Sequence, residues 1–210
     1  MLTIENAETF GWEAAIRWMR NPKNSWSKSD SRWSSPHENG TDAPMFIVGE
    51  NDLKLASALA NSGADDGKFL RMIHVQLDVT APLYWHKEAD QYKVGTVTDS
   101  CSTMHKIHAK EFTLDDFSHE HLYSPLHDLK PTVDLLNVYR ERFLDTKDKE
   151  DWWKLIHLLP SSYNQRRTWD LNYAVLRNIY HARRNHKIDE WHTLCDWIET
   201  LPYAKELICG

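Results

Sequence analysis

The fold of this chain is decided by the stretch Ile73-His74-Val75-Gln76-Leu77-Asp78-Val79, followed by Pro82-Leu83-Tyr84-Trp85-His86-Lys87-Glu88-Ala89-Asp90. In the first part apolar and polar residues alternate, and this period of two predicts a strand over residues 69–79 with one covered face. In the second part Thr80 and Pro82 suit the cap and the first turn of a helix. A strand that leads through a short turn into a helix with an imidazole, an ammonium and carboxylates is a favourable frame for a binding site.

Length, charge and cysteine content limit the class of protein. A chain of 210 residues can form one substantial core and is short for two, so we expect a single domain over residues 1–210. A net charge of −6 argues against broad nucleic-acid binding. Cys101, Cys195 and Cys209 are odd in number and lack paired spacing, which predicts reduced thiols in a cytoplasmic protein. No secretory signal and no apolar run of about 18 residues is seen, so no membrane association is expected.

The remaining periodicity predicts an α+β fold, in which a small, mostly antiparallel sheet is packed by several long helices. A second strand is expected at 45–48. Residues 21–44 are polar and form a predicted long surface loop; its Trp26 and Trp33 favour docking, for example on a neighbouring subunit. The capping-box spacing of Ser162 and Gln165 predicts a long helix to about residue 185. Other helices are expected at 12–19, 51–61, 83–93, 131–143, 148–159 and 188–201.

The 82–90 segment resembles the signature Q-L-V-R-H-R-x-A-S of the flavin-dependent thymidylate synthases, also called thymidylate synthase complementing proteins. Leu83, His86 and Ala89 match this signature, and Lys87 matches it in charge. The signature is degenerate, and the departures fall at Pro82, Trp85 and Asp90. The resemblance implies that flavin, as FAD, contacts Trp85, His86, Lys87 and Asp90. The alternative from periodicity alone is a solvated helix face held by local salt bridges.

Two further segments are candidates for binding a pyrimidine nucleotide. The hydroxyl-rich stretch 95–106 lacks the family's N-x-x-S-x-R-Y, and Ser100, Ser102 and Lys106 are possible substitutes; Lys93 would add charge. The stretch 159–168 has helix-start features that favour phosphate, and it offers Ser161, Ser162, Gln165 and Arg167. For both segments a purely structural role, as a polar loop and as a helix cap, is an equal alternative. The chain also keeps the family's Asn172, His181 and an arginine pair at Arg183 and Arg184, but lacks the arginine of the last helix.

Metal and thiol chemistry are not expected. The pairs His105–His108 and His119–His121 have no evident third ligand. Among the thiols, only Cys101 lies outside a predicted buried stripe or the chain end. No catalytic residue is identified.

The resemblance implies methylation of dUMP to dTMP with reduced flavin and a folate donor, in a homo-oligomer, expected to be a tetramer, with active sites between subunits. In this chemistry the protein places the rings and polarises the pyrimidine. The rival interpretation is a non-catalytic nucleotide-binding protein, such as a regulatory or phage accessory protein, that keeps the fold. A third is an enzyme that modifies a different pyrimidine nucleotide.

Overall fold

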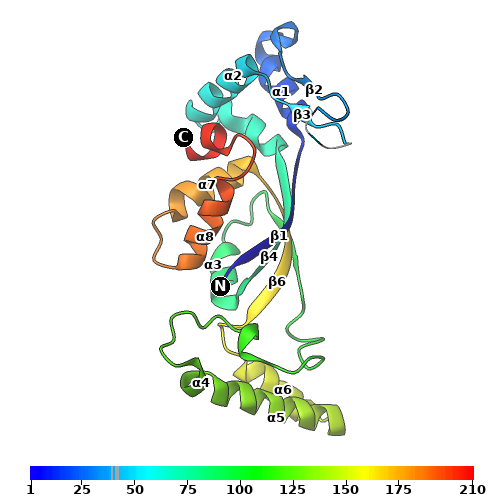
Figure 1. Cartoon of the computed structure of the whole chain (residues 1–210), viewed down its shortest axis with the longest axis vertical. Helices are drawn as coiled ribbons and strands as arrows, with labels where there is room; N and C mark the ends of the chain where they lie inside the picture. Colours follow the sequence, from blue (N-terminus) through cyan, green and yellow to red (C-terminus); the bar gives the residue numbers. More distant parts are fainter. Residues whose placement is uncertain (39, 41–42) are drawn as a thin grey trace. The chain divides into compact units, whose positions relative to one another are not determined.

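The computed structural model describes residues 1–38, 40 and 43–210, and the remaining positions of the predicted 21–44 loop lie outside the described residues. The chain has an α+β fold (Figure 1). Its main sheet is small and antiparallel, with the strand order β1-β4-β6-β5. These strands are β1 (Thr3–Phe10), β4 (His74–Pro82), β6 (Asn164–Asn172) and β5 (Val97–Ser100). The predicted fold class is confirmed.

By contacts the chain divides into two compact units. The first comprises Met1–Glu5, Asp78–Gln91 and Thr98–Thr168, and the second comprises Asn6–Leu77, Tyr92–Val97 and Trp169–Gly210. The boundary falls within β4 and again at Thr168 of β6. A single domain over the whole chain therefore stays a prediction.

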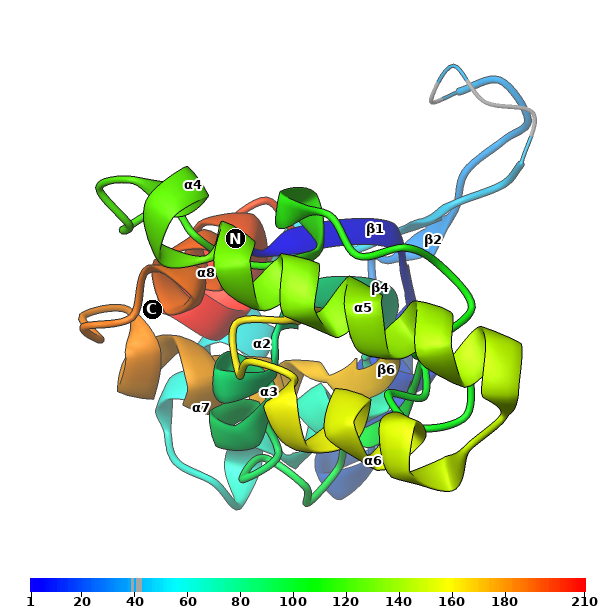
Figure 2. The same ribbon diagram turned by 90° about the horizontal axis from the view of Figure 1, so that it is seen from below.

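The first unit is built around a helical pair. Helices α5 (Lys130–Thr146) and α6 (Lys149–Leu158) lie side by side, as Figure 2 shows. Their facing sides bury Val133, Leu136 and Leu155 together with aromatic residues of the preceding loop. The unit also holds α3 (Leu83–Ala89), the turn η4 (Leu114–Asp116) and α4 (Pro125–Asp128). Removing this aliphatic surface from water stabilises the unit by roughly 25 cal/mol per Å².

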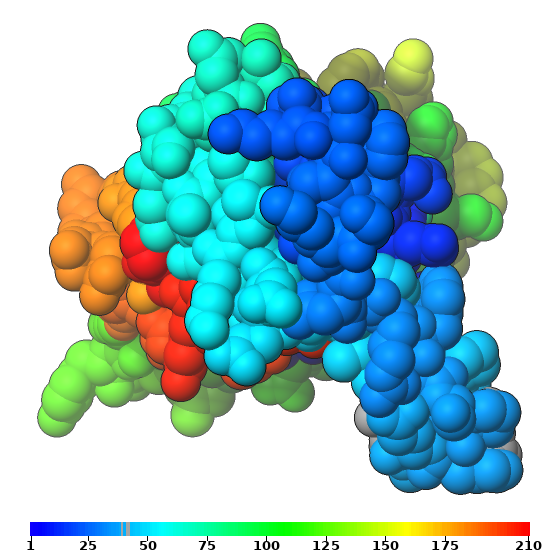
Figure 3. All heavy atoms as spheres, turned by 90° about the horizontal axis from the view of Figure 1, so that it is seen from above, coloured from blue at the N-terminus to red at the C-terminus, as the bar shows by residue number. Residues whose placement is uncertain are grey.

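The second unit packs helices around large aromatic side chains. Its helices are α1 (Trp12–Arg20), α2 (Glu50–Asn61), α7 (Tyr173–Arg183) and α8 (Asp189–Ile198). Shorter turns are η1 (Asn21–Lys23), η2 (Trp26–Lys28), η3 (Asp66–Met72) and the π-helical η5 (Lys205–Cys209). Tyr173, Trp191 and Phe69 are fully buried. Strands β2 (Arg32–Trp33) and β3 (Phe46–Ile47) pair as a small hairpin, which projects beside α1 and α2 in Figure 3.

Most of the predicted elements are confirmed. The helices expected at 12–19, 51–61, 131–143 and 148–159 and the helix that follows Ile188 are present, as are strands at β3 and β4. The strand predicted over 69–79 begins only at His74, because the residues before it form the turn η3, and the helix predicted over 83–93 ends at Ala89. In β4 the side chains of Val75, Leu77 and Val79 are buried, as the alternating pattern predicts. The 21–44 region is more structured than expected, because its η1, η2 and β2 are ordered elements.

The helix predicted to start at the capping-box spacing is wrong in its first half. Residues 164–172 form strand β6, and helix α7 begins only at Tyr173. Gln165, Trp169 and Leu171 are buried whereas Arg166 and Thr168 are exposed, which is the period of a strand. Pairing with β4 in the sheet overrides the local cap signal. Asn172 is the actual cap of α7, since its side chain accepts from the Val175 amide.

Two smaller corrections concern the ends of the main sheet. Thr80 lies within β4 and caps no helix, and Pro82 occupies the cap position of α3. Strand β1 was not predicted, because its sequence TIENAETF carries little apolar periodicity. No helix in the described residues is long and apolar enough to cross a bilayer.

Candidate functional site

The predicted flavin residues Trp85 and His86 are interior residues of the first unit. Both side chains have 0% relative exposure, and their rings meet edge to face at 5.2 Å. His86 Nε2 lies 2.9 Å from the backbone oxygen of Gln165. A carbonyl oxygen only accepts, so Nε2 is the protonated nitrogen. Burial lowers the pKa of His86 to about 4, and the imidazole is therefore neutral at pH 7.

Four of the residues predicted to bind flavin or nucleotide in the first unit meet in one polar network. Arg167 Nη1 lies 2.6 Å from Asp90 Oδ1, and Arg167 Nε donates to Gln165 Oε1 at 3.0 Å. The Gln165 amide in turn donates to the backbone oxygen of Cys101 at 2.7 Å. His86, Asp90, Gln165 and Arg167 are thus brought together, and they bind one another. Each as a ligand residue stays a prediction.

Lys87 is the exposed side chain of α3 next to this network. It directly follows His86 in the sequence, and it is the residue that matches the family signature in charge. Its position leaves an ammonium at the surface of α3, which suits an anionic group of a ligand.

Ser161 and Ser162 lie just before β6. The backbone oxygen of Ser161 accepts from the Tyr84 amide at 3.0 Å, and that of Ser162 accepts from the Ser118 amide at 2.8 Å. No helix starts here, so the physical reason for expecting a phosphate at this turn is wrong. The two serines stay predicted ligand residues without that support.

The hydroxyl-rich segment forms β5 and a local turn. Ser102 Oγ accepts from the amides of Met104 at 3.1 Å and His105 at 3.0 Å, which closes the turn. Lys106 is exposed beyond it. Ser100 lines a small cavity of about 220 Å³ with Asp99, Cys101, Arg166 and Thr168.

The guanidinium of Arg166, which lines that cavity, already forms ion pairs with two carboxylates. Arg166 Nη2 lies 2.7 Å from Asp78, and Arg166 Nη1 lies 3.2 Å from Glu5. The hydrogen bond to Asp78 and its negative charge raise the pKa of Arg166. An anionic ligand at Ser100 would have to compete with these carboxylates.

Sequence reasoning missed a second cluster, which lies wholly in the second unit. Arg183, at the end of α7, donates from Nε to the Tyr92 hydroxyl at 2.8 Å. Its guanidinium lies over two rings, 5.6 Å from the centre of Tyr92 and 4.9 Å from that of Trp191. Such contacts hold the cation in a fixed orientation. Tyr92 directly precedes Lys93, which is predicted to bind nucleotide. The Arg183 guanidinium is therefore held against the residue next to Lys93 in the sequence.

The loop after Lys93 packs closely on the start of α7. Gly95 has φ +82°, and a Cβ there would lie 3.1 Å from Asn172 Nδ2 and 3.2 Å from Val175. Asn172 Nδ2 also faces the Gly95 carbonyl oxygen at 3.4 Å. This close approach requires glycine, both for its dihedral angle and for its lack of a side chain.

The residue after Gly95, Thr96, carries a buried hydroxyl. Thr96 Oγ1 is buried and has no hydrogen-bond partner among the described residues. A buried hydroxyl without a partner costs about 1–3 kcal/mol of stability unless a ligand or a water molecule forms a hydrogen bond with it. Thr96 lies in the same loop as Lys93, whereas Asn172 caps the start of α7 and Arg183 lies at its end. The retained Asn172 and Arg183 were the sequence signals that could have led to this cluster. The companion residues His181 and Arg184 are exposed.

The described residues contain no group of three or more side chains able to hold a metal ion. Burial raises the pKa of Cys195 to about 11 and also raises that of Cys209. Both thiols are therefore protonated at neutral pH and are poor nucleophiles. Cys101 is exposed.

Comparison with known proteins finds solved structures with a similar fold, but no protein family that matches the sequence. No family model and no curated protein matches the sequence. Thymidylate synthase X from Helicobacter pylori, crystallised with FAD and dUMP, is similar with a TM-score of 0.72 at 14% identity, over 99% of this chain and 97% of that one. A second structure of that enzyme with FAD and dUMP gives a TM-score of 0.65 at 14% identity, over 99% and 97%.

A related enzyme extends the likeness. The UMP/dUMP methylase PolB from Streptomyces cacaoi, bound with 5-Br dUMP, is similar with a TM-score of 0.64 at 12% identity, over 100% of this chain and 95% of that one. All three likenesses span nearly the whole length of both chains. The resemblance seen in the 82–90 segment is confirmed at the level of structure, and this chain has the fold of the flavin-dependent thymidylate synthases.

Proposed function

We propose that the chain is a flavin-dependent methylase of a pyrimidine deoxynucleotide that converts dUMP to dTMP with FAD and a folate donor. The observation that carries the proposal is the fold likeness over 99% of the chain to an enzyme crystallised with FAD and dUMP. In this proposal the chain binds and orients its ligands and supplies no attacking group.

The cluster in the second unit is the part of this chain that best suits the nucleotide. Arg183 would pair with a phosphate as a planar cation, and Lys93 would add a second positive charge. Thr96 Oγ1 and the Asn172 amide would bond the polar atoms of the ligand. Reduced flavin, when bound, supplies the electrons that turn the transferred one-carbon unit into a methyl group.

The first unit would have a supporting role. The network of Asp90, Arg167 and Gln165 ties the loop after α3 to strand β6. Lys87, exposed on α3, is then the residue of the signature segment that could meet an anionic part of the cofactor.

One observation favours the rival, a nucleotide-binding protein that keeps the fold without the reaction. The side chain that matches the signature histidine, His86, is fully buried and bonded to Gln165. In this rival the nucleotide binds and no product forms, so binding and turnover measurements separate the two.

Binding is tested by titrating the protein with FAD, read from flavin fluorescence and absorption, and with dUMP by calorimetry. We expect saturable binding of both, in the range of tens of micromolar or tighter, which corresponds to about −6 kcal/mol. Arg183→Ala should weaken dUMP binding at least about tenfold, the range for a charged hydrogen bond. Arg184→Ala, a change in the adjacent exposed arginine, is the matched control and should leave binding unchanged. A chain that binds neither ligand would contradict the proposal.

A further inference from the structure

The second unit contains a groove that the proposed reaction does not use. It has a volume of about 280 Å³ and lies between α1 and the segment that leads into the hairpin. Trp26 of η2 and Trp33 of β2 line it, and we call it the Trp26–Trp33 groove. Its charged lining residues are one carboxylate and three guanidinium groups, those of Glu13, Arg17, Arg20 and Arg32. The groove is therefore richer in cations than the chain as a whole, whose net charge is −6.

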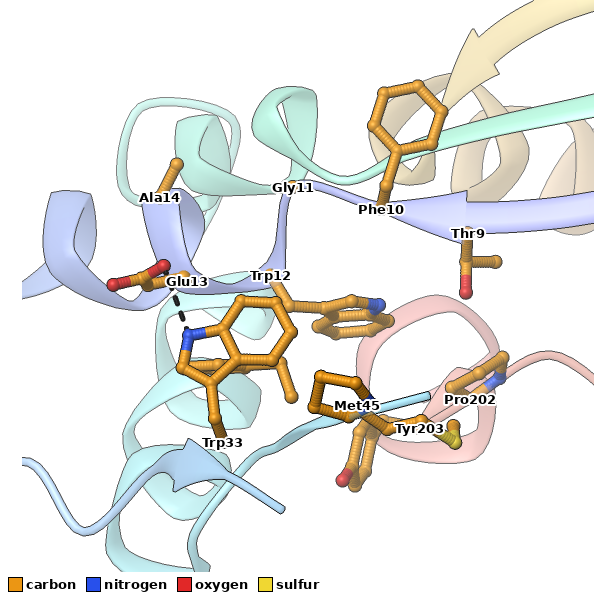
Figure 4. Close-up of a pocket in the computed structure, with 12 residues that line it drawn as sticks. Thr9, Phe10, Gly11, Trp12, Glu13, Ala14, Trp33, Met45, Pro202 and Tyr203 are labelled. Atoms are coloured by element: carbon orange, nitrogen blue, oxygen red, sulfur yellow. Dashed lines mark hydrogen bonds between the residues drawn. The ribbon is translucent and has the colours of Figure 1, made fainter. Parts of the chain in front are cut away.

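Both indole rings of the groove are half exposed and held in place. Trp26 is 50% exposed and donates from Nε1 to Asn21 Oδ1 at 2.8 Å. Trp33 is 53% exposed, and its Nε1 lies 3.4 Å from Glu13 Oε2, as Figure 4 shows. The Trp33 ring also meets that of Phe46 edge to face at 5.4 Å. Rings in such positions offer a flat apolar face to a ligand, because covering that face removes it from water.

The chain between the two rings is anchored to the interior of the unit. Asp52 is fully buried and accepts hydrogen bonds from the Ser29 hydroxyl at 2.5 Å and the Ser31 hydroxyl at 2.6 Å. Arg20 Nε lies 2.6 Å from the other carboxylate oxygen. Since both serines lie between the two tryptophans in the sequence, these bonds hold the rings in position before any ligand binds. A site held ready in this way loses little free energy to ordering when it binds.

Three cations in the elements around the groove have no carboxylate partner. The exposed side chains of Arg17 in α1, Lys23 in η1 and Lys28 in η2 form no ion pair and no hydrogen bond with the described residues. By contrast, Lys54 Nζ of the same unit lies 2.7 Å from Glu50 Oε1. The three free cations belong to three successive elements, and this spread suits several phosphates of one ligand.

Of the arginines that line the groove, Arg17 is the one available to a ligand. Arg32 donates from Nη1 and Nη2 to the two carboxylate oxygens of Glu38, at 2.9 and 2.5 Å. Arg20 is paired with Asp52. A negatively charged ligand would therefore pair with Arg17 without breaking an existing ion pair.

The order of rings and charges along the chain is typical of a surface for single-stranded nucleic acid. Positive charges and indoles are interleaved in the order Lys23, Trp26, Lys28, Arg32, Trp33. Unpaired bases stack on tryptophan with their flat faces while the backbone contacts cations, whereas a duplex hides those faces in its own base stack. Since the rest of the chain is acidic, the contact is limited to a few phosphates, and broad nucleic-acid binding is still not expected.

We propose that the Trp26–Trp33 groove binds a short stretch of single-stranded nucleic acid. Bases stack on the two indoles, and neighbouring phosphates pair with Arg17, Lys23 and Lys28. The proposal goes beyond the methylase reaction and does not depend on it, because it uses no residue assigned to FAD or dUMP.

The test is fluorescence anisotropy of a labelled oligothymidylate of about eight nucleotides, titrated with the full chain at low salt. The comparison probes are the same strand in a duplex and an abasic strand that keeps the phosphates. We expect saturable binding of the single strand and at least about fivefold weaker binding of both comparison probes, the loss for one base stack. An oligouridylate of equal length identifies whether DNA or RNA binds more tightly, and binding of either supports the proposal. Free dTMP, added as competitor, should not displace the strand.

Two positions connect the binding to the groove. Trp26→Ala should weaken binding of the strand at least about fivefold, and Trp26→Phe, which keeps a ring for stacking, should restore most of it. Arg17→Ala should make the slope of log affinity against log salt concentration less negative by about 0.7, the value for one phosphate contact on a single strand. Arg142→Ala, an exposed arginine of the first unit, is the matched control and should change neither readout. Circular dichroism melting verifies that each variant folds.

Four results would overturn the proposal. These are no saturation by either single strand, equal binding of the abasic strand or the duplex, displacement of the strand by dTMP, and unchanged binding in Trp26→Ala. Displacement by dTMP would place the strand in a mononucleotide site instead of the groove. Failure of this proposal leaves the methylase proposal untouched, since FAD and dUMP binding are measured separately.

Discussion

The Arg167 guanidinium is bound to the Asp90 carboxylate, with Nη1 2.6 Å from Oδ1, across 77 positions of the sequence. Arg167 is largely buried at 14% exposure, whereas Asp90 is half exposed at 49%. The pair joins the residue that follows α3 to strand β6. A cation predicted to bind nucleotide is therefore already engaged by a residue predicted to bind cofactor.

This pair should couple measurably in stability. We expect Arg167→Ala to destabilise the chain and a double-mutant cycle with Asp90→Ala to give a coupling of about 1 kcal/mol, because one partner is shielded from solvent. Urea unfolding measures each variant. The exposed pair Glu50 and Lys54 is the control and should couple by only about 0.3–0.5 kcal/mol. Equal coupling in the two cycles would mean that the Arg167 pair is an ordinary surface contact.

Acid should weaken the fold through His86. Burial lowers its folded pKa to about 4 from 6.5, so the unfolded chain takes up this proton first as the pH falls. The free energy of unfolding should therefore decrease between pH 6.5 and 4, by about 3 kcal/mol from this group. His86→Gln keeps a donor for the Gln165 carbonyl and cannot titrate, so it should flatten the pH dependence. His127→Gln, at an 87% exposed position, should retain it. A wild-type profile that is flat in this range would contradict the assignment.

The sequence predicts some parts of this structure well and others poorly. Where one periodicity dominates, as in β4 and α8, the pattern alone locates the element, because burial on one face fixes it. It fails at residues 164–172, where a cap-like spacing competes with sheet pairing over a long sequence distance. The cap at Asn172 was hidden for the same reason, since the helix was expected to begin ten residues earlier.

The candidate site was harder to predict than the fold. The signature segment correctly indicates the family fold, yet its histidine is interior. The contact of Arg183 with Tyr92 and Trp191 joins residues from three separate segments, and no spacing rule encodes it. Only the retained Asn172 and Arg183 pointed towards it.

The buried carboxylate of Asp52 should be essential for the hairpin. Burial acts to raise its pKa, but hydrogen bonds from Ser29, Ser31 and Arg20 outweigh this effect and lower the pKa. Asp52→Asn breaks a buried ion pair, and we expect a loss of stability of about 3–5 kcal/mol. Limited proteolysis should then cut within residues 32–47 before the rest of the chain. Asp65→Asn, at a position 95% exposed, should leave both readouts unchanged.

Self-association into a tetramer is a further prediction. Large apolar side chains remain exposed within the first unit, among them Leu126 at 71%, Val138 at 43% and Trp153 at 42%. Exposed apolar surface of this kind favours an interface. Light scattering at micromolar concentration should give about four times the 24.7 kDa chain mass. Trp153→Glu should lower that mass, and a wild-type mass of one chain would rule the prediction out.

The proposed reaction is tested most directly by product formation. The purified chain is incubated anaerobically with FAD, a chemical reductant, methylenetetrahydrofolate and dUMP, and dTMP is measured by mass spectrometry. We expect dTMP formation that depends on FAD and on the folate, and that falls at least about tenfold in Arg183→Ala but not in Arg184→Ala. Tight binding of FAD and dUMP with no dTMP would contradict the methylase assignment and establish the non-catalytic alternative.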